Sequence, residues 1–437
     1  MMRTSDRPSD VSHRWLLVAA TSLGLSSLAA AALVLARTPV LTSLVPSDSF
    51  PRALVVHVNL ATLLWYFAMA SALWSETLDT GRERLARPIQ LAGTAGAAGI
   101  ILAGLFAPGP PVLANYVPYI DHPLFLGSLA LLAFAAVATA ALSLSRPRDA
   151  AEWGFAIARV PFLLAALYLI AALRQEMGLI DALWGAGHIL QFGFVTLMMA
   201  IWLRLAQRAG TDGIPARTAI PLFAAASLPA LIAPALLVAG IEHGTLHGLH
   251  THIMRWANWP APLVFGLLLL FRPRAASAVA FPASLGLYCI GIVAGTAIDD
   301  QTTLIPAHYH GTIGAFTLAQ MAAVLARLTP SADAHGARGP TRRPLTLYAL
   351  GTAMLICGLA WSGILGAPRK TGFSAADADP TAILAAALTG LGGAVTIAGV
   401  AFFALVAAPR IVRLCRSRTA PMPQNNQGTA TMFAAAR

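Results

Sequence analysis

The amino-acid sequence predicts an all-α fold, a polytopic membrane protein of about twelve transmembrane helices. Hydrophobic residues make up 57% of the 437 residues and charged residues only 11%, and the mean hydropathy is +0.70. A soluble domain of this composition would expose too much apolar surface. Apolar runs of about 20 residues, enough to cross about 30 Å of hydrocarbon, recur along the chain, and basic residues gather in alternate loops.

Twelve such runs can be placed on the sequence. The first is too long for a signal peptide, and no small-residue cleavage site follows it, so we expect it to remain as a span. The expected organisation is a cytoplasmic segment at 1–14, a membrane domain at 15–410 and a flexible cytoplasmic tail at 411–437. The runs are 15–36, 52–75, 88–107, 122–144, 155–173, 181–203, 218–241, 257–272, 276–297, 305–327, 346–366 and 381–409.

The distribution of the basic residues predicts the orientation. With the N-terminus inside, all but six of the 29 Lys and Arg residues fall on the inner side, as expected for cytoplasmic loops. We therefore expect an integral protein of the bacterial inner membrane with both termini cytoplasmic. The net charge of +11 is spread over many loops, so it indicates topology and argues against a nucleic-acid partner. The six outer residues are Arg37, Arg52, Arg174, Arg255, Arg369 and Lys370.

The three cysteines offer neither a disulfide framework nor a covalent haem attachment motif. Cys289 and Cys357 fall within spans and Cys415 in the tail, so they are too scattered for either purpose. An electron-donating cytochrome c must therefore be another chain.

Histidines are placed at one predicted depth. In this topology every intramembrane histidine falls in the outer half of the membrane, and those of "IEHGTLHGLHTHIMRW" stand at the C-terminal end of the seventh run. One alternative is that they are interfacial histidines satisfied by water or carbonyls. Burying an ionisable side chain in a membrane costs free energy, so such residues are usually functional. Several histidines at one depth therefore favour a cofactor site. They are His57, His188, His243, His247, His250, His252, His308 and His310.

The pair in "PAHYHG" has a geometric meaning. Successive residues of a helix are about 100° apart, so His308 and His310 point to opposite sides of their helix. Each can ligate a different flat group, and haem held by an axial histidine is the obvious candidate.

These motifs resemble the catalytic subunit I of the haem-copper oxidase and nitric oxide reductase superfamily, a twelve-helix membrane protein, over nearly the whole chain. The segment "AHYH" is similar to the His-x-His pair of that family's tenth helix. The resemblance implies two haems in a haem-binding membrane domain. It gives His308 to a high-spin haem at the active site, and His310 with His57 of "HVNLATLLWYF" to a low-spin haem.

The segment "LGAPRKTG" resembles the family loop whose basic pair binds haem propionates. Arg369 and Lys370 fill that pair here, on the side where propionates would emerge. Lys in the second position weakens bidentate pairing. The alternative is a plain solvated loop charge.

The family also holds a second metal, with one histidine of helix six and two adjacent histidines at the end of helix seven. "WGAGHILQF" supplies His188, but no His-His pair follows. Counting back from Gly248 places Glu242 and His243 in the two slots, and Glu242 then also counts among the catalytic residues. Two histidines and one carboxylate favour a non-haem iron over copper.

A rival arrangement of this metal site stays open. Glu242 would then carry protons, with His247, His250 or His252 completing the ligands. The i, i+4 spacing of His243 and His247 also permits shared ligation from one helix face.

The gas that is reduced depends on what lines this pocket. Oxidases of the family carry a tyrosine there, whereas Phe192 stands four residues after His188 and no tyrosine occurs in 218–259. Coupling two NO molecules to N2O needs only two electrons and two protons, so the sequence favours nitric oxide reduction. The reductases' glutamate at the Phe192 position is missing, and Gln191 is the nearest polar substitute.

We therefore expect a respiratory oxidoreductase that reduces NO at the His308 haem and a non-haem metal, fed by the His57/His310 haem. Its electron donor would be a cytochrome c or a cupredoxin-type subunit. Reduction of O2 to water is the runner-up. A haem-binding membrane protein without turnover, serving NO tolerance or sensing, is the third alternative. The few acids near the pocket, Glu176, Asp181 and Glu242, suggest that protons arrive from the outer side.

Overall fold

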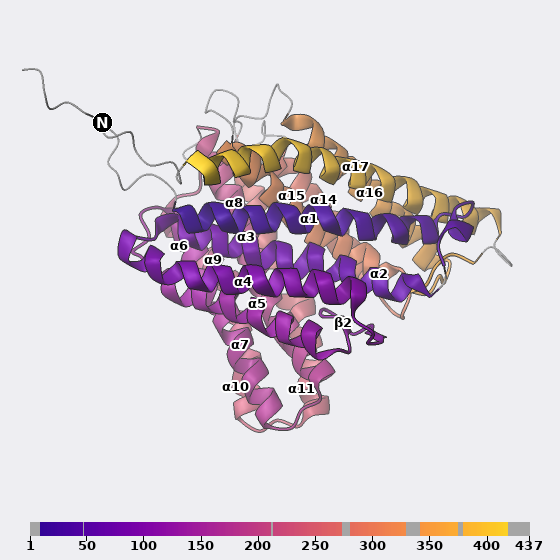
Figure 1. Cartoon of the computed structure of the whole chain (residues 1–437), viewed down its shortest axis with the longest axis horizontal. Coiled ribbons are helices and arrows are strands. Elements are labelled where there is room, and N and C mark those ends of the chain that lie inside the picture. The colour runs from indigo at the N-terminus through magenta and orange to yellow at the C-terminus, as the bar shows by residue number, and fades with distance from the viewer. Residues whose placement is uncertain are drawn as a thin grey trace, which may run out of the picture.

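The computed structural model describes residues 9–46, 48–210, 213–272, 280–328, 341–374 and 379–417. Within these ranges the chain is a bundle of long helices that run side by side (Figure 1). One antiparallel pair of two-residue strands, β1 (Pro111–Val112) and β2 (Tyr119–Ile120), lies between helices. The main helices are α1 (Asp10–Arg37), α2 (Ser49–Val58), α3 (Trp65–Trp74), α4 (Thr80–Phe106), α5 (Pro123–Leu142), α6 (Ala150–Ile157), α7 (Arg159–Arg174), α8 (Leu179–Arg208), α9 (Ala216–Ser227), α10 (Ile232–Val238), α11 (His243–Ala257), α12 (Pro260–Leu270), α14 (Ala280–Thr296), α15 (Leu304–Leu328), α16 (Arg342–Ile364) and α17 (Pro380–Ser417).

The predicted polytopic membrane class is confirmed. Eleven helices of the described ranges are long and apolar enough to cross a membrane, and α14 is an apolar helix of 17 residues. Several begin at the side-chain caps that the sequence offers: Ser9, Asp79 and Asp149 each accept a hydrogen bond from a backbone N–H of the first turn.

The second span changes pitch in its middle. A π-helical turn at Asn59–Leu64 joins α2 to α3, so that Ser49–Trp74 forms one span. The hydroxyl of Ser22 on α1 donates to the Leu60 carbonyl of this turn at 2.6 Å. Such wide turns inside α-helices occur frequently at functional sites, and this one begins two residues after His57.

Helices α14 and α15 approach very closely at two glycines. A Cβ on Gly291 would lie 2.6 Å from the Thr312 nitrogen, and one on Gly311 would overlap the Gly291 backbone. Small residues at a helix crossing allow this backbone contact within a membrane. The crossing fixes the α15 segment that carries His308 and His310.

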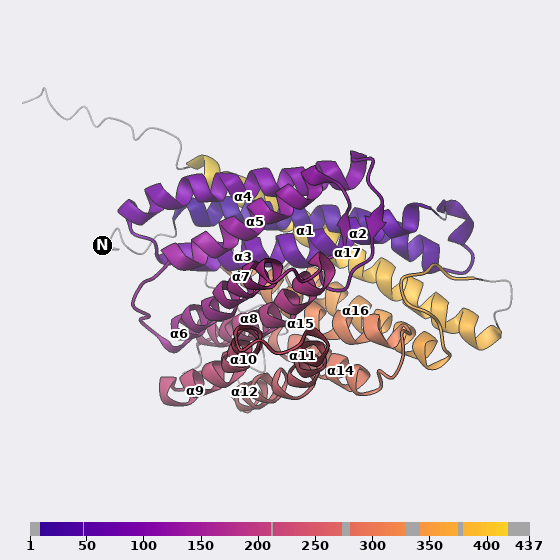
Figure 2. The same ribbon diagram turned by 90° about the horizontal axis from the view of Figure 1, so that it is seen from below.

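The expectation that His243 to His252 lie at the C-terminal end of the seventh helix is wrong, because they belong to the next span, His243–Leu270. The seventh run is broken at the 3-10 turn Leu228–Leu231, continues as α10, and ends before Gly240, whose φ of +74° suits glycine. Glu242 then caps a separate helix, α11. In Figure 1, α10 and α11 project from the long side of the bundle, and in Figure 2 they lie in front of α8, which α11 contacts.

The ends of the predicted membrane domain lie within helices. Helix α1 already begins at Asp10, inside the expected N-terminal segment 1–14, and α17 continues through Ser417, past the expected start of the tail at 411. The rest of that tail lies outside the described residues.

Candidate functional site

The predicted site histidines lie toward one end of the bundle, which we call the histidine end. Helix α15 and the Ser49–Trp74 span run in the same direction, because their C-terminal ends meet in the ion pair of Glu76 and Arg327. The Tyr66 hydroxyl holds the two together by donating to the Ile313 carbonyl at 2.8 Å. The N-terminal halves of both therefore share the opposite end.

This packing brings His57 and His310 together. Each precedes the Tyr66 contact on its own helix, and the two imidazoles lie within electrostatic range of one another. The structure thus places within electrostatic range of one another the two residues that the resemblance assigns to one low-spin haem.

His188 of α8 lies at nearly the same level as His308. Helices α8 and α15 also run in parallel, and the Phe194 and Phe316 rings touch with centroids 5.8 Å apart. His188 precedes Phe194 by six residues and His308 precedes Phe316 by eight. At 1.5 Å per residue, the two histidines differ in depth by only about 3 Å.

Four of the histidines share one hydrogen-bonding pattern. The Nδ1 atoms of His57, His188, His308 and His310 face the carbonyls of Ser26, Trp184, Gly291 and Pro306 at 3.1, 2.9, 2.8 and 2.7 Å. A carbonyl can only accept, so each Nδ1 carries the proton and Nε2 keeps its lone pair. This is the tautomer that second-shell carbonyls impose on metal-bound histidines.

His308 and His310 turn to different sides of α15, as their spacing predicts. His308 bonds to α14, where Gly295 also leaves room for its ring, whereas His310 bonds within its own helix and lies within electrostatic range of His57. In the described part of the chain, the Nε2 atoms of His57, His308 and His310 form no hydrogen bond. The donor set therefore fits axial ligation of two haem irons.

A second group of imidazoles surrounds Trp184, and we call it the Trp184 cluster. His247 stacks on the indole with centroids 3.7 Å apart and planes within 7°, and the ring of His188 lies 3.9 Å away. His250 is 5.7 Å from His188 and 5.4 Å from Tyr168. Its Nε2 atom is buried without a hydrogen bond, which costs about 1–3 kcal/mol unless a ligand satisfies it.

The structure does not bring the predicted carboxylate into this cluster. Glu242 is exposed, and its carboxylate accepts hydrogen bonds from the Gly244 and Thr245 backbone at 3.3 and 3.4 Å, which lower its pKa. It precedes His250 by eight residues, about 12 Å along the helix, and His243 beside it is also exposed.

The residues present therefore do not form the predicted second-metal set. Of His188, Glu242, His243 and His247, only His188 and His247 meet at Trp184, and His250 joins them. Among all residues that the structure describes, no three His, Cys, Asp or Glu side chains are grouped so that they could hold a metal ion.

Sequence reasoning missed Tyr116, which lies against His188. Its hydroxyl is 3.2 Å from His188 Nε2, and because Nδ1 already donates to a carbonyl, the phenol donates to Nε2. Tyr116 adopts a left-handed φ of 65°, and the missing side chain of Gly187 makes room for it. Burial raises the pKa of this phenol, which keeps it protonated. Its 72-residue separation from His188 leaves no local sequence signal.

The predicted propionate pair borders the same region. The Lys370 ammonium donates to the Leu113 carbonyl and, at 3.0 Å, to Asn115, which fixes the loop that carries Tyr116. Burial, and secondarily the neighbouring Arg369, lowers the pKa of Lys370 to about 8. Arg369 and Arg37 both lie within electrostatic range of Tyr309, the residue between the two α15 histidines. Arg37 is a second cation beside these histidines that the sequence placed outside but did not assign.

The comparisons with known proteins give relatives but no function. No family model matches the chain. An uncharacterized protein of Aquifex aeolicus (strain VF5) is 26% identical over 330 residues, which cover 70% of this chain and 82% of the relative. An uncharacterized protein of Rickettsia prowazekii (strain Madrid E) is 22% identical over 500 aligned positions, which cover 91% of this chain and 95% of the relative.

Proposed function

We propose that this chain is a membrane respiratory oxidoreductase of the haem-copper type that reduces nitric oxide. The observation that carries the proposal is the shared state of His57, His308 and His310: each Nδ1 is held by a carbonyl, and each Nε2 is left for a ligand. Bound haem would supply electron transfer at the His57/His310 pair and gas binding at His308. The protein's place would be the bacterial inner membrane, with both termini cytoplasmic and a cytochrome c or cupredoxin-type subunit as donor.

Side chains of the protein would balance the charge of the haem propionates and carry protons. Arg369 and Arg37 place two cations beside Tyr309, where haem propionates need counter-charges. Tyr116 is a protonated phenol at His188, and Tyr168 stands 5.4 Å from His250 and within electrostatic range of Asp181. These groups would pass protons toward the cluster from the histidine end.

Nitric oxide is the first candidate because coupling two NO molecules to N2O requires only two electrons and two protons at the site. Dioxygen is the second candidate, and Tyr116 favours it, since a phenol beside His188 is the local donor that O–O cleavage uses in the resembled oxidases.

The test begins with metal analysis and spectroscopy of the purified, haem-supplied protein. Two haems, steady N2O formation and little O2 uptake support the first candidate, whereas O2 uptake with copper supports the second. Consumption of neither gas with any donor would leave a haem-binding membrane protein without turnover, serving NO tolerance or sensing.

Variants locate the haems. His310→Ala should remove the low-spin spectrum, and His308→Ala only the high-spin signal. His252→Ala is the matched control, because His252 is exposed on α11 and should leave both spectra intact. A colourless wild-type protein would refute the proposal.

A further inference from the structure

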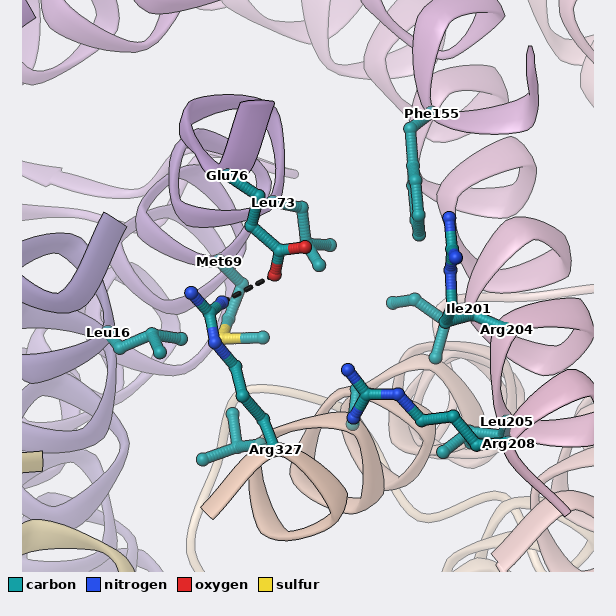
Figure 3. A pocket seen from close by; sticks show the side chains of 12 residues that line it. Leu16, Met69, Leu73, Glu76, Phe155, Ile201, Arg204, Leu205, Arg208 and Arg327 are labelled. Carbon is teal, nitrogen blue, oxygen red and sulfur yellow. Dashed lines mark hydrogen bonds and ion pairs between the residues drawn. The ribbon is translucent and has the colours of Figure 1, made fainter. Parts of the chain in front are cut away.

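A hollow lies at the end of the bundle opposite the histidine end. Helices α1, α3, α6, α8 and α15 surround it, and it measures about 450 Å³, part of it open to solvent. Three arginines and one carboxylate share its wall: Arg204, Arg208, Arg327 and Glu76. Figure 3 shows Glu76, Arg208 and Arg327 turned into the hollow, and Arg204 beside Phe155 at its wall.

Two of the arginines are already neutralised. Arg327 forms an ion pair with Glu76 and donates to the Ser12 hydroxyl at 3.0 Å, with only 10% of its side chain exposed. Arg204 contacts Asp149 at 3.0 Å and Glu152 at 3.9 Å. These pairs hold both guanidinium groups in place.

Arg208 is the uncompensated charge. It lies within electrostatic range of Glu76, Arg204 and Arg327, but Glu76 is engaged by Arg327. Within the described ranges, no hydrogen bond or ion pair joins Arg208 to another residue. Its guanidinium points into the hollow toward Arg327 (Figure 3). The hollow therefore holds one positive charge in excess, presented by a planar group that suits phosphate oxygens.

The remaining wall is apolar. Leucine, isoleucine, methionine and phenylalanine side chains line it, among them Leu16, Met69 and Ile201. A free inorganic ion gains nothing from such a wall, whereas the glycerol and first methylenes of a lipid do. Basic pockets between transmembrane helices bind lipid head groups for these reasons.

We propose that this hollow binds a phosphate group carrying one negative charge, and that its source is the phosphodiester head group of an anionic phospholipid. One charge on the diester matches the one unpaired guanidinium. Free phosphate shares the polar chemistry but not the apolar contacts, so the two sources can be separated by experiment.

The experiment is native mass spectrometry of the full chain in a non-ionic detergent, titrated with phosphatidylglycerol, phosphatidylcholine or inorganic phosphate. We expect phosphatidylglycerol to bind roughly tenfold more tightly than phosphatidylcholine, the contribution of one charge-assisted contact. Arg208→Gln should remove this preference, and Arg208→Lys should retain part of it. Arg217→Gln is the matched control, because it removes the same charge from an exposed position on α9 and should change nothing.

Three results would overturn the proposal: equal binding of the two lipids, an unchanged preference in Arg208→Gln, or an equal loss in Arg217→Gln. Inorganic phosphate that competes fully with phosphatidylglycerol would overturn the lipid source. The thermal melting curve of Arg208→Gln, compared with that of the unaltered protein, reports folding independently of lipid binding.

Discussion

Lys370 is the only lysine of the chain, and its titration offers a direct measurement of the environment at the histidine end. Burial lowers its pKa from the usual 10.5 to about 8. At pH 8 about half of Lys370 would then be neutral, compared with less than about 1% of an ordinary lysine, a difference of roughly 100-fold in reactive amine.

The assay is pulsed acetylation at pH values from 6 to 10, read by peptide mass spectrometry. The protein N-terminus serves as internal reference, because its pKa is about 7.7–8. The labelling midpoint of Lys370 should lie near pH 8 in the folded protein and return above pH 10 in denaturing detergent. Arg369→Gln should move the folded midpoint upward, because it removes the neighbouring positive charge.

The sign of the stability effect follows from the same shift. The folded state binds the Lys370 proton less tightly than the unfolded state, so this residue's contribution to the free energy of unfolding is lowest below pH 8. That contribution grows as the pH rises from about 8 toward 10.5. Haem supply should raise the midpoint, because propionates add negative charge beside Lys370. A folded midpoint above pH 10 without haem would refute the burial that we ascribe to this amine.

Three further outcomes are expected. Gly311→Ala should destabilise the protein by about 1–3 kcal/mol through the clash with the Gly291 backbone and weaken the high-spin haem signal, as read by thermal melting and by carbon monoxide difference spectra; Gly286→Ala, where nothing lies within 4 Å, should do neither. Tyr116→Phe should cost about 0.5–1.5 kcal/mol and lower any O2 turnover more than NO turnover, and equal loss with both gases would contradict a specific role for the phenol. Glu242→Gln should leave metal content and turnover within about twofold, because the carboxylate caps α11, whereas loss of a metal would restore it as a ligand.

The lengths of the apolar runs were enough to predict the fold class, because a helix that crosses the hydrocarbon needs about 20 apolar residues whatever the tertiary packing. The opposed directions of His308 and His310 also followed from helix geometry alone. The break between α9 and α11 did not, although Pro229, Gly240 and the N-cap residue Glu242 were visible in the sequence. The apolar run hid these signals because hydropathy averages over them.

Contacts between distant segments were beyond sequence reasoning. Tyr116 reaches His188 only because its loop folds back over α8, and Lys370 meets Asn115 across more than 250 residues. Within the Trp184 cluster, the three histidines were named from the sequence, and Trp184 itself could have been, since it precedes His188 by four residues on one helix face.

The wide turn at Asn59–Leu64 sets the rotational phase of the second span. Over nine residues an uninterrupted α-helix would put His57 and Tyr66 about 180° apart, whereas one residue absorbed by the turn reduces this angle to about 80°. The imidazole of His57 and the phenol of Tyr66 can then both lie toward the same neighbour, α15. A helical wheel drawn through this segment misassigns every position beyond the turn. Deleting one residue of the turn would leave a regular α-helix with eight steps between His57 and Tyr66, which keeps the angle of about 80°.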